Sequence, residues 1–368
     1  MHGCKFHLTN SDGLLQEPRK NSLTLKSKLS FTFPVSNVKS PLQVNHDRAQ
    51  AFFKIHFSNL VLNALKVICD PSKSALESAN ENAPGVEVID NYKDVIKCSE
   101  IDALVIATPA YTHFKLAAAA LGAGKDVFVE KPLALNASDG EKLKQMAVKN
   151  QRILMVGHLL EYHPAILKLQ DLIKDGKLGI INYIYSNRLN FGKIRTEENA
   201  LWSFAPHDMA VILRLIGEMP VKVTCNGGNY LKSKLADVTI STLEFRAGQK
   251  AHVFVSWLNP FKEQKLVVMG DRRMAVFDDV QSTDKLKIYD QNVVYDDQLP
   301  VLKKCGENVI KYSMVEPLRA ECEHFIKCIQ TSTEPLTNAK SAVNVLKVLE
   351  ACQVSLRKGG TPVNIKDI

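Results

Sequence analysis

The segment NHDRAQAFFKIHFSNLVLNALKVICD, residues 45–70, indicates the fold class of the first half of the chain. Its end, ALKVICD at 64–70, is a short apolar run closed by an aspartate. The second strand of a dinucleotide-binding fold ends in this way, with the acid reaching a ribose. A Gly-x-Gly-x-x-Gly turn should stand about 20 residues earlier, yet no glycine occurs between Gly13 and Gly85.

Strand-like and helix-like segments alternate after this run, up to residue 158. DALVIATP at 102–109 is continuously apolar, as expected for a strand that is covered on both faces. DVFVEKP at 126–132 reads as the next strand, and Ser138 with Glu141 then forms a capping box that opens a helix. Short links between alternating elements predict βαβ units around a parallel sheet.

The pattern changes in the second half of the chain. Helices are expected at 159–179 and at 206–217, where Pro206 would begin the second one. Long strand-like runs follow up to residue 290, and helices return at 316–331 and 338–357. A run of long strands flanked by helices predicts an α+β domain with an open, mainly antiparallel sheet.

We therefore expect three regions. Residues 1–45 form a loosely ordered segment, and residues 46–155 form a Rossmann-like domain with an atypical start. Residues 156–368 form a substrate-binding and oligomerisation domain with a C-terminal helix. The predicted fold class is α/β plus α+β. The first strand of the parallel sheet is doubtful, because FTFPVSNVKSPLQV contains two prolines.

Composition excludes several classes of protein. The formal net charge is +8, but lysine and arginine are spread among acids, which argues against nucleic acid as a partner. No apolar run approaches the roughly 20 residues that span a membrane. The eight cysteines are scattered without a Cys-x-x-Cys pair, so we expect reduced thiols in a cytoplasmic protein and no metal site.

Two positions are suited to proton transfer. Glu130 and Lys131 stand where a parallel strand ends, and ligands of doubly wound sheets bind at that edge. A lysine there can hold a substrate hydroxyl, although a surface ion pair is the plainer interpretation. His207 would lie in the first turn of a helix, where the helix dipole lowers its pKa and suits it to act as a base. A capping or packing role is the alternative for His207.

Four stretches together resemble the glucose–fructose oxidoreductase/inositol dehydrogenase (Gfo/Idh/MocA) family. They are ATPAYTH at 107–113, Glu130-Lys131-Pro132, GHLLEYHP at 157–164 and APHD at 205–208. The similarity covers roughly residues 60–368. NRLNFGKIRTEENALW and VSWLNPFKEQKLVVMGDRRMAVFDD look most like the branch that oxidises UDP-activated N-acetylamino sugars or their uronates.

The resemblance implies an NAD(P)-dependent dehydrogenase that works as a homo-oligomer, a dimer or tetramer, through its open sheet. Asp70 would bind the adenine-side ribose and favour NAD, with NADP possible. Lys131 would contact nicotinamide and substrate, His207 would be the acid/base, and a cis bond often precedes Pro132. The other implied positions are Thr108, Pro109, His113 and Glu130 in the cofactor cleft, and Arg188, Arg195 and Asn199 for an anionic sugar nucleotide. An exposed polar loop is an equal alternative for the last three.

Two departures from the family pattern keep alternatives open. Ser203 stands where relatives carry an aspartate four residues before the histidine, so no carboxylate assists His207. Counting back from Asp70, the missing glycines fall near Asp47, Ala49 and Phe52, whose side chains hinder close approach of a pyrophosphate. The chain is therefore either a sugar dehydrogenase or a non-catalytic relative that binds a sugar nucleotide without cofactor. A third possibility is that residues 1–55 are not the native start.

Overall fold

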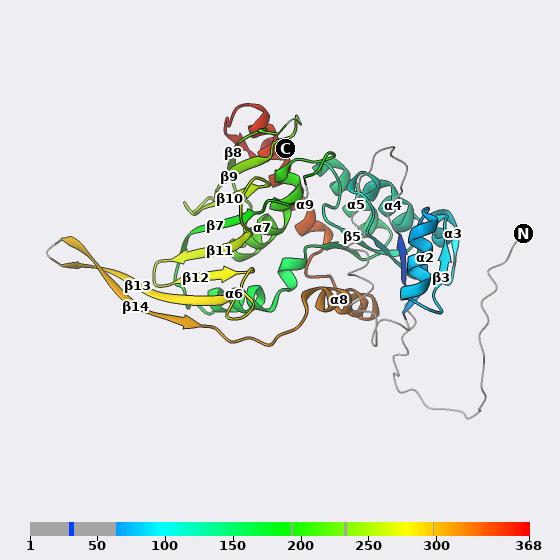
Figure 1. Ribbon diagram of the computed structural model, residues 1–368, viewed down its shortest axis with the longest axis horizontal. Helices are drawn as coiled ribbons and strands as arrows, with labels where there is room; N and C mark the ends of the chain where they lie inside the picture. The colour runs from blue at the N-terminus through cyan, green and yellow to red at the C-terminus, as the bar shows by residue number, and fades with distance from the viewer. Residues whose placement is uncertain (1–28, 33–63, 193, 232–233, 297) are drawn as a thin grey trace, which may run out of the picture.

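The computed structural model describes residues 29–32, 64–192, 194–231, 234–296 and 298–368. These residues form two lobes that lie side by side, with the parallel sheet in one and a wide mixed sheet in the other (Figure 1). Most of the predicted N-terminal segment, and the positions 47–52 where the glycine turn was sought, lie outside the described residues.

The N-terminal lobe is built on a six-stranded sheet in the order β3-β2-β1-β4-β5-β6. All its neighbouring strands are parallel, and β4 and β6 are buried along their whole length. This order is that of a doubly wound nucleotide-binding sheet, as predicted. The strands are β1 Leu29–Thr32, β2 Leu65–Cys69, β3 Glu87–Ile89, β4 Ala103–Ile106, β5 Asp126–Glu130 and β6 Leu154–Gly157.

The structure places a strand, β1, within the segment 1–45, where the sequence left the first strand of the parallel sheet doubtful. Residues 29–32 pair with β2 on one side and with β4 on the other, so they form a central strand of the sheet. Proline cannot donate a ladder hydrogen bond, but Pro34 and Pro41 both come after the strand ends. The prolines therefore do not exclude a strand over 29–32.

Helices connect the parallel strands. They are α2 Lys73–Asn82, α3 Tyr92–Lys97, α4 Ala110–Gly122 and α5 Ala137–Lys149. The capping box predicted at Ser138 and Glu141 is wrong, because the Asn136 side chain accepts a hydrogen bond from the Asp139 backbone N–H at 2.7 Å and caps the helix. Asparagine is as good an N-cap as serine, and it comes two residues earlier in the chain.

The C-terminal lobe contains a nine-stranded sheet in the order β14-β13-β12-β11-β7-β10-β9-β8-β15. Only β7 and β10 run parallel to each other, so the sheet is mainly antiparallel, as predicted. Beyond the sheet, β13 and β14 continue as a projecting hairpin (Figure 1). The strands are β7 Ile181–Leu189, β8 Lys222–Gly228, β9 Val238–Glu244, β10 Lys250–Ser256, β11 Glu263–Gly270, β12 Met274–Asp278, β13 Leu286–Asp296, β14 Leu299–Val309 and β15 Val363–Asn364.

The last helices of the chain join the two lobes. On one side α9 packs with α7 in the core of the wide sheet, and on the other its Val343 and Leu346 pack among α4 and α5. The Phe325 ring of α8 lies 5.6 Å from the Phe128 ring of β5. The remaining elements are η1 Leu159–Tyr162, α6 Pro164–Lys174, α7 Ala200–Ile216, α8 Pro317–Thr331, α9 Ala339–Arg357 and η2 Ile365–Asp367. The described part of the chain holds no helix that is long and apolar enough to cross a membrane.

Candidate functional site

The exit of strand β5 meets helix α7 through Lys131. The Lys131 Nζ donates a hydrogen bond to the backbone carbonyl of Ser203 at 2.8 Å, across a separation of 72 residues. A cis peptide bond joins Lys131 to Pro132, which confirms the expectation from the family resemblance. The carboxyl edge of the parallel sheet is therefore joined directly to the helix that carries His207.

His207 lies inside helix α7 and not at its start. The helix begins at Ala200 behind the N-cap Asn199, so the prediction that Pro206 begins it is wrong. His207 is about two turns from the N-terminus, and the argument from the helix dipole, which acts within the first turn, no longer applies to it. It is only 7% exposed. Because Ser203 and His207 are four residues apart, they lie on the same face of α7. Lys131 thus contacts the backbone of α7 one turn before His207.

Asp70 lies at the end of β2, where the sequence predicts a ribose-binding acid. Its Oδ1 accepts a hydrogen bond from the Ser72 backbone N–H at 2.8 Å. Its Oδ2 is buried and has no hydrogen-bond partner among the described residues. Burial raises the pKa of Asp70 to about 6. A buried carboxylate oxygen that lacks a donor fits a ribose hydroxyl, so this end of the site is compatible with NAD.

His113 ties two of the predicted cofactor segments together. Its Nδ1 lies 2.7 Å from the Pro132 carbonyl and its Nε2 lies 2.8 Å from the Thr108 carbonyl. Burial is the main cause that lowers the pKa of His113. The Thr108 hydroxyl lies 2.5 Å from the Thr112 hydroxyl, and Pro109 precedes the first turn of α4. His113 therefore holds the turn at Thr108 against the loop that follows Lys131.

The three residues predicted for the anionic substrate have different surroundings. Arg188 is buried, and its Nε and Nη2 donate to the two carboxylate oxygens of Asp208 at 2.6 and 3.1 Å. Arg195 is partly exposed and forms an ion pair with Glu198 at 3.5 Å. Asn199 caps α7 by accepting a hydrogen bond from the Trp202 backbone N–H at 3.1 Å. Asp208 adjoins His207, so Arg188 contacts the neighbour of the predicted acid/base residue.

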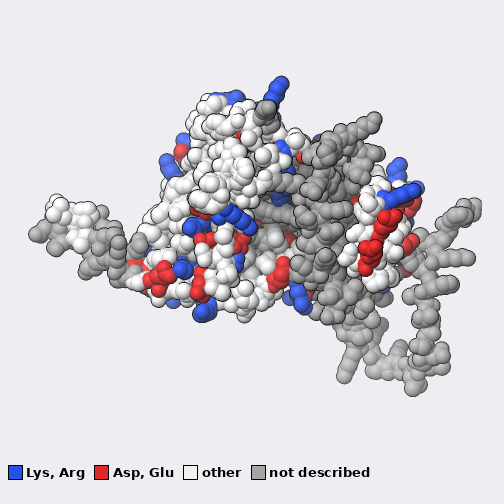
Figure 2. Space-filling view, viewed as in Figure 1, with Lys and Arg blue, Asp and Glu red and all other residues white. Residues whose placement is uncertain are grey.

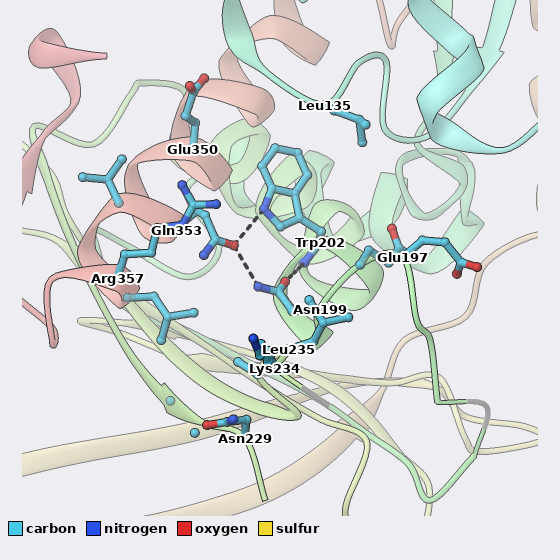
Figure 3. Close-up of a pocket in the computed structure, with 16 residues that line it drawn as sticks. Leu135, Glu197, Asn199, Trp202, Asn229, Lys234, Leu235, Glu350, Gln353 and Arg357 are labelled. Carbon is cyan, nitrogen blue, oxygen red and sulfur yellow. Dashed lines mark hydrogen bonds between the residues drawn. The ribbon is translucent and has the colours of Figure 1, made fainter. Parts of the chain in front are cut away.

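A cavity of about 560 Å³ opens beside the N-terminus of α7 (Figure 3). Gln353 of α9 lies at the wall of this cavity. Its side-chain oxygen accepts hydrogen bonds from Asn199 Nδ2 at 2.8 Å and from Trp202 Nε1 at 3.2 Å. Lys234 and Arg357 also line the cavity. The lining residues do not include Lys131, Ser203 or His207, so the cavity does not contain the Lys131–Ser203 contact.

His158 is a further candidate for the site, and the sequence did not single it out. It follows directly after β6, it is 2% exposed, and its Nδ1 is buried without a hydrogen-bond partner among the described residues. Burial, together with the positive charges of Lys131 and Arg214, lowers the pKa of His158 to about 3. The available signal was its place in the quoted stretch GHLLEYHP, immediately after a parallel strand.

On the face of the molecule seen in Figure 2, lysine and arginine are interspersed with aspartate and glutamate. The described residues of this face form no single basic patch. Within the residues that the structure describes, no group of three or more His, Cys, Asp or Glu side chains is arranged to hold a metal ion.

Two family models match the chain. Residues 43–158 match the GFO/IDH/MocA oxidoreductase family with an NAD-binding Rossmann fold, and residues 166–276 match the GFO/IDH/MocA C-terminal domain. Among curated proteins, the chain is 27% identical to UDP-N-acetylglucosamine 3-dehydrogenase of Acidithiobacillus ferrooxidans over 63% of this chain and 71% of that protein. It is 30% identical to inositol 2-dehydrogenase 1 of Saccharopolyspora erythraea over 44% of this chain, which spans half of that relative.

Solved structures share the fold across nearly the whole chain. The structure of the Acidithiobacillus ferrooxidans enzyme has a TM-score of 0.73 at 22% identity and covers 90% of this chain and 98% of its own. An aldose–aldose oxidoreductase from Caulobacter crescentus has a TM-score of 0.73 at 19% identity, with 92% and 99% covered. At these identities the likeness concerns the fold.

Proposed function

Because the chain belongs to the GFO/IDH/MocA family of NAD-binding oxidoreductases, we propose that it transfers a hydride between a nicotinamide cofactor and a hydroxyl-bearing carbon of a sugar or sugar nucleotide. The hydrogen bond from Lys131 Nζ to the Ser203 carbonyl carries this proposal. It joins the strand edge where a nicotinamide cofactor would bind to α7, one turn before His207.

The residues of this chain divide the work as follows. A bound NAD would supply the hydride acceptor, and Asp70 Oδ2 would hold its ribose. Lys131 donates a hydrogen bond to the substrate oxygen and favours loss of the hydroxyl proton as the carbonyl forms. His207 accepts that proton, and the buried Arg188–Asp208 pair beside it fixes this part of α7. Ser203 contributes a carbonyl to Lys131 and no charge to His207, so we expect slow turnover.

We further propose a UDP-N-acetylamino sugar as the substrate class to test first. Support comes from similarity to the Acidithiobacillus ferrooxidans enzyme and from the cavity beside α7. The cavity is lined by the cations Lys234 and Arg357 as well as by the acids Glu197, Glu198 and Glu350, and the cations are of the kind that binds diphosphate oxygens. Arg195 and Asn199 lie at the same end of α7, which keeps them as candidates for the anionic part of the substrate.

Reduction of NAD, followed by absorbance at 340 nm, tests the proposed function. The purified chain is supplied with NAD or NADP and with UDP-N-acetylglucosamine, its uronate or myo-inositol. Lys131→Ala should lower kcat by about a hundredfold or more, because it removes the group that assists proton loss. Unchanged turnover in Lys131→Ala would reject the catalytic assignment, and Lys142→Ala, an exposed lysine on α5, serves as the matched control.

The alternative function is that of a cofactor-deficient relative, which binds a sugar nucleotide without catalysis. The absence of glycine between Gly13 and Gly85 and the serine at position 203 favour it. Calorimetric titration distinguishes the two functions. Micromolar binding of NADH supports the dehydrogenase, whereas tight binding of UDP-N-acetylglucosamine without any binding of NAD or NADH supports the non-catalytic protein.

We also propose that copies of the chain associate through the outer face of the wide sheet, which is the face not covered by α7 and α9. The Tyr185 and His252 rings stack there, with centroids 5.2 Å apart and planes 7° apart. Phe254 pairs in register with Ile240, which is 48% exposed. Contiguous exposed apolar and aromatic side chains mark a protein–protein interface.

A further inference from the structure

The position of His158 places it next to the proposed reaction centre. Glu130 and Gly157 are register partners in adjacent parallel strands, so the residues that follow them, Lys131 and His158, lie side by side at the carboxyl edge of the sheet. Ligands of doubly wound sheets bind at this edge. His158 is thus in the region where a nicotinamide or a substrate would be held.

Both backbone polar groups of His158 form hydrogen bonds, whereas its ring Nδ1 forms none within the described residues. The backbone N–H donates to the Val156 carbonyl at 2.8 Å, and the carbonyl accepts from the Glu161 N–H at 2.9 Å. In the described part of the chain, Nδ1 is buried without a partner. Buried side-chain polar atoms are normally hydrogen-bonded, so an orphan one calls for a bound group. The fold therefore buries this ring without using its Nδ1.

The two cations beside His158 are Lys131 and Arg214, and both donate hydrogen bonds to other groups. Lys131 donates to the Ser203 carbonyl. Arg214 forms an ion pair with Glu161 and donates to the Leu336 carbonyl at 2.7 Å. Both positive charges oppose protonation of His158, so its imidazole stays neutral and keeps an acceptor nitrogen. A neutral acceptor near two cations suits an uncharged O–H or N–H donor and disfavours an ammonium group.

We propose that His158 is a ligand-contacting residue of this site and that its imidazole accepts a hydrogen bond from an uncharged O–H or N–H group of the molecule bound beside Lys131. This inference rests on the proposed function. Two sources share the chemistry, namely a hydroxyl of the sugar and the carboxamide of the nicotinamide. His158 would then add to Lys131 and His207 a third contact that orients the ligand.

His158→Leu and His158→Gln, compared with the wild-type full chain, test the inference. The probes are NADH, followed by its fluorescence, and UDP-N-acetylglucosamine, followed by calorimetry with and without NADH. Loss of one hydrogen bond should weaken binding of one probe by about tenfold in His158→Leu. His158→Gln, which keeps a neutral acceptor, should stay closer to wild type. Weaker NADH binding identifies the carboxamide, and weaker sugar-nucleotide binding identifies the hydroxyl.

Thermal unfolding separates this role from a structural one. Replacing an unpaired buried nitrogen by an apolar side chain of similar size should leave the melting temperature unchanged or raise it. His324→Leu is the control, because His324 Nε2 accepts from the Leu336 N–H at 3.0 Å; it should lower the melting temperature and spare binding. Wild-type affinity of His158→Leu for both probes overturns the inference alone and leaves the ring bonded to internal water. Failure of the wild type to bind either probe overturns the proposed function and the inference together.

Discussion

At the scale of single residues, Asp70 shows how a binding group costs stability. Its pKa is raised to about 6 by burial, so the folded state holds the Asp70 proton more tightly than the unfolded chain, where the pKa is near 3.8. The ionised carboxylate therefore weakens the fold at pH values above about 6. This penalty fades as pH falls through the interval between 6 and 3.8.

Asp70→Asn should consequently stabilise the protein at pH 8, by on the order of 1–3 kcal/mol, and the gain should shrink towards pH 4. Urea unfolding of both proteins across this range measures it. Asp139→Asn is a control of opposite sign, because the pKa of Asp139 is lowered by its hydrogen bond with Lys142. Its loss of stability should appear at pH 8 and diminish in acid. A gain for Asp70→Asn that is independent of pH contradicts the account.

Arg188 carries a second prediction at this scale. Arg188→Leu would leave the Asp208 carboxylate buried without its cation, and breaking such a pair costs about 3–5 kcal/mol. The double variant Arg188→Leu/Asp208→Asn should recover a large part of that loss. Arg195→Leu should change the free energy of unfolding by less than about 1 kcal/mol, because its ion pair is partly exposed. A stable Arg188→Leu protein with a raised KM would instead favour direct contact with the substrate.

The sequence predicts some of these residues and misses others for a physical reason. Lys131 and Asp70 follow apolar strands, and that local pattern places them at the ligand-binding edge of the sheet. The bond between Lys131 and Ser203, and the bidentate pair of Arg188 with Asp208, join distant parts of the chain. Local periodicity carries no information about such pairs, nor about the unused nitrogen of His158.

At the scale of secondary-structure elements, the sequence predicted the regular strands and misplaced several helix boundaries. The single helix expected at 159–179 is divided into η1 and α6, which ends at Lys174. Continuous apolar runs predicted β4 and β5 within a few residues of the observed limits. The start of α7 was misjudged because proline is common in the first turn of helices. Here the helix starts directly after the N-cap Asn199, and Pro206 lies within it. The four-residue strand β1 is too short for any period to be visible.

The contact between α5 and α9 yields a prediction about how the lobes are joined. A Cβ added at Gly140 would lie 2.6 Å from Leu346 Cδ1 and 3.3 Å from Val343 Cγ2. Gly140→Ala should therefore destabilise the protein by about 1–2 kcal/mol, despite the better helix propensity of alanine. Gly122→Ala on α4 meets no atom within 4 Å and should be neutral or stabilising. Chemical denaturation measures the free energy of unfolding of both variants, and equal effects of the two substitutions would contradict this packing.

At the scale of the whole molecule, the outer face of the wide sheet predicts the assembly. Ile240→Lys/Phe254→Lys places two charges in the exposed apolar patch and should dissociate a dimer or tetramer into monomers without unfolding them. Size-exclusion chromatography with light scattering measures the mass, which is 41.0 kDa for one chain. Lys66→Glu, an exposed change on the other lobe, is the control. An oligomer that survives the double substitution places the interface elsewhere.

The fate of the hydride tests the central claim most directly. The wild-type chain, in excess over substrate, is incubated with NAD and with UDP-N-acetylglucosamine deuterated at its ring carbons, and the nicotinamide is analysed by mass spectrometry. A single turnover suffices, so slow catalysis or weak cofactor binding does not hide the reaction. We predict reduced nicotinamide that carries a single deuterium, formed at least about a hundredfold more slowly in Lys131→Ala than in the wild type. Nicotinamide that stays fully oxidised with this substrate, and with deuterated myo-inositol, would contradict the assignment of this protein as a sugar dehydrogenase.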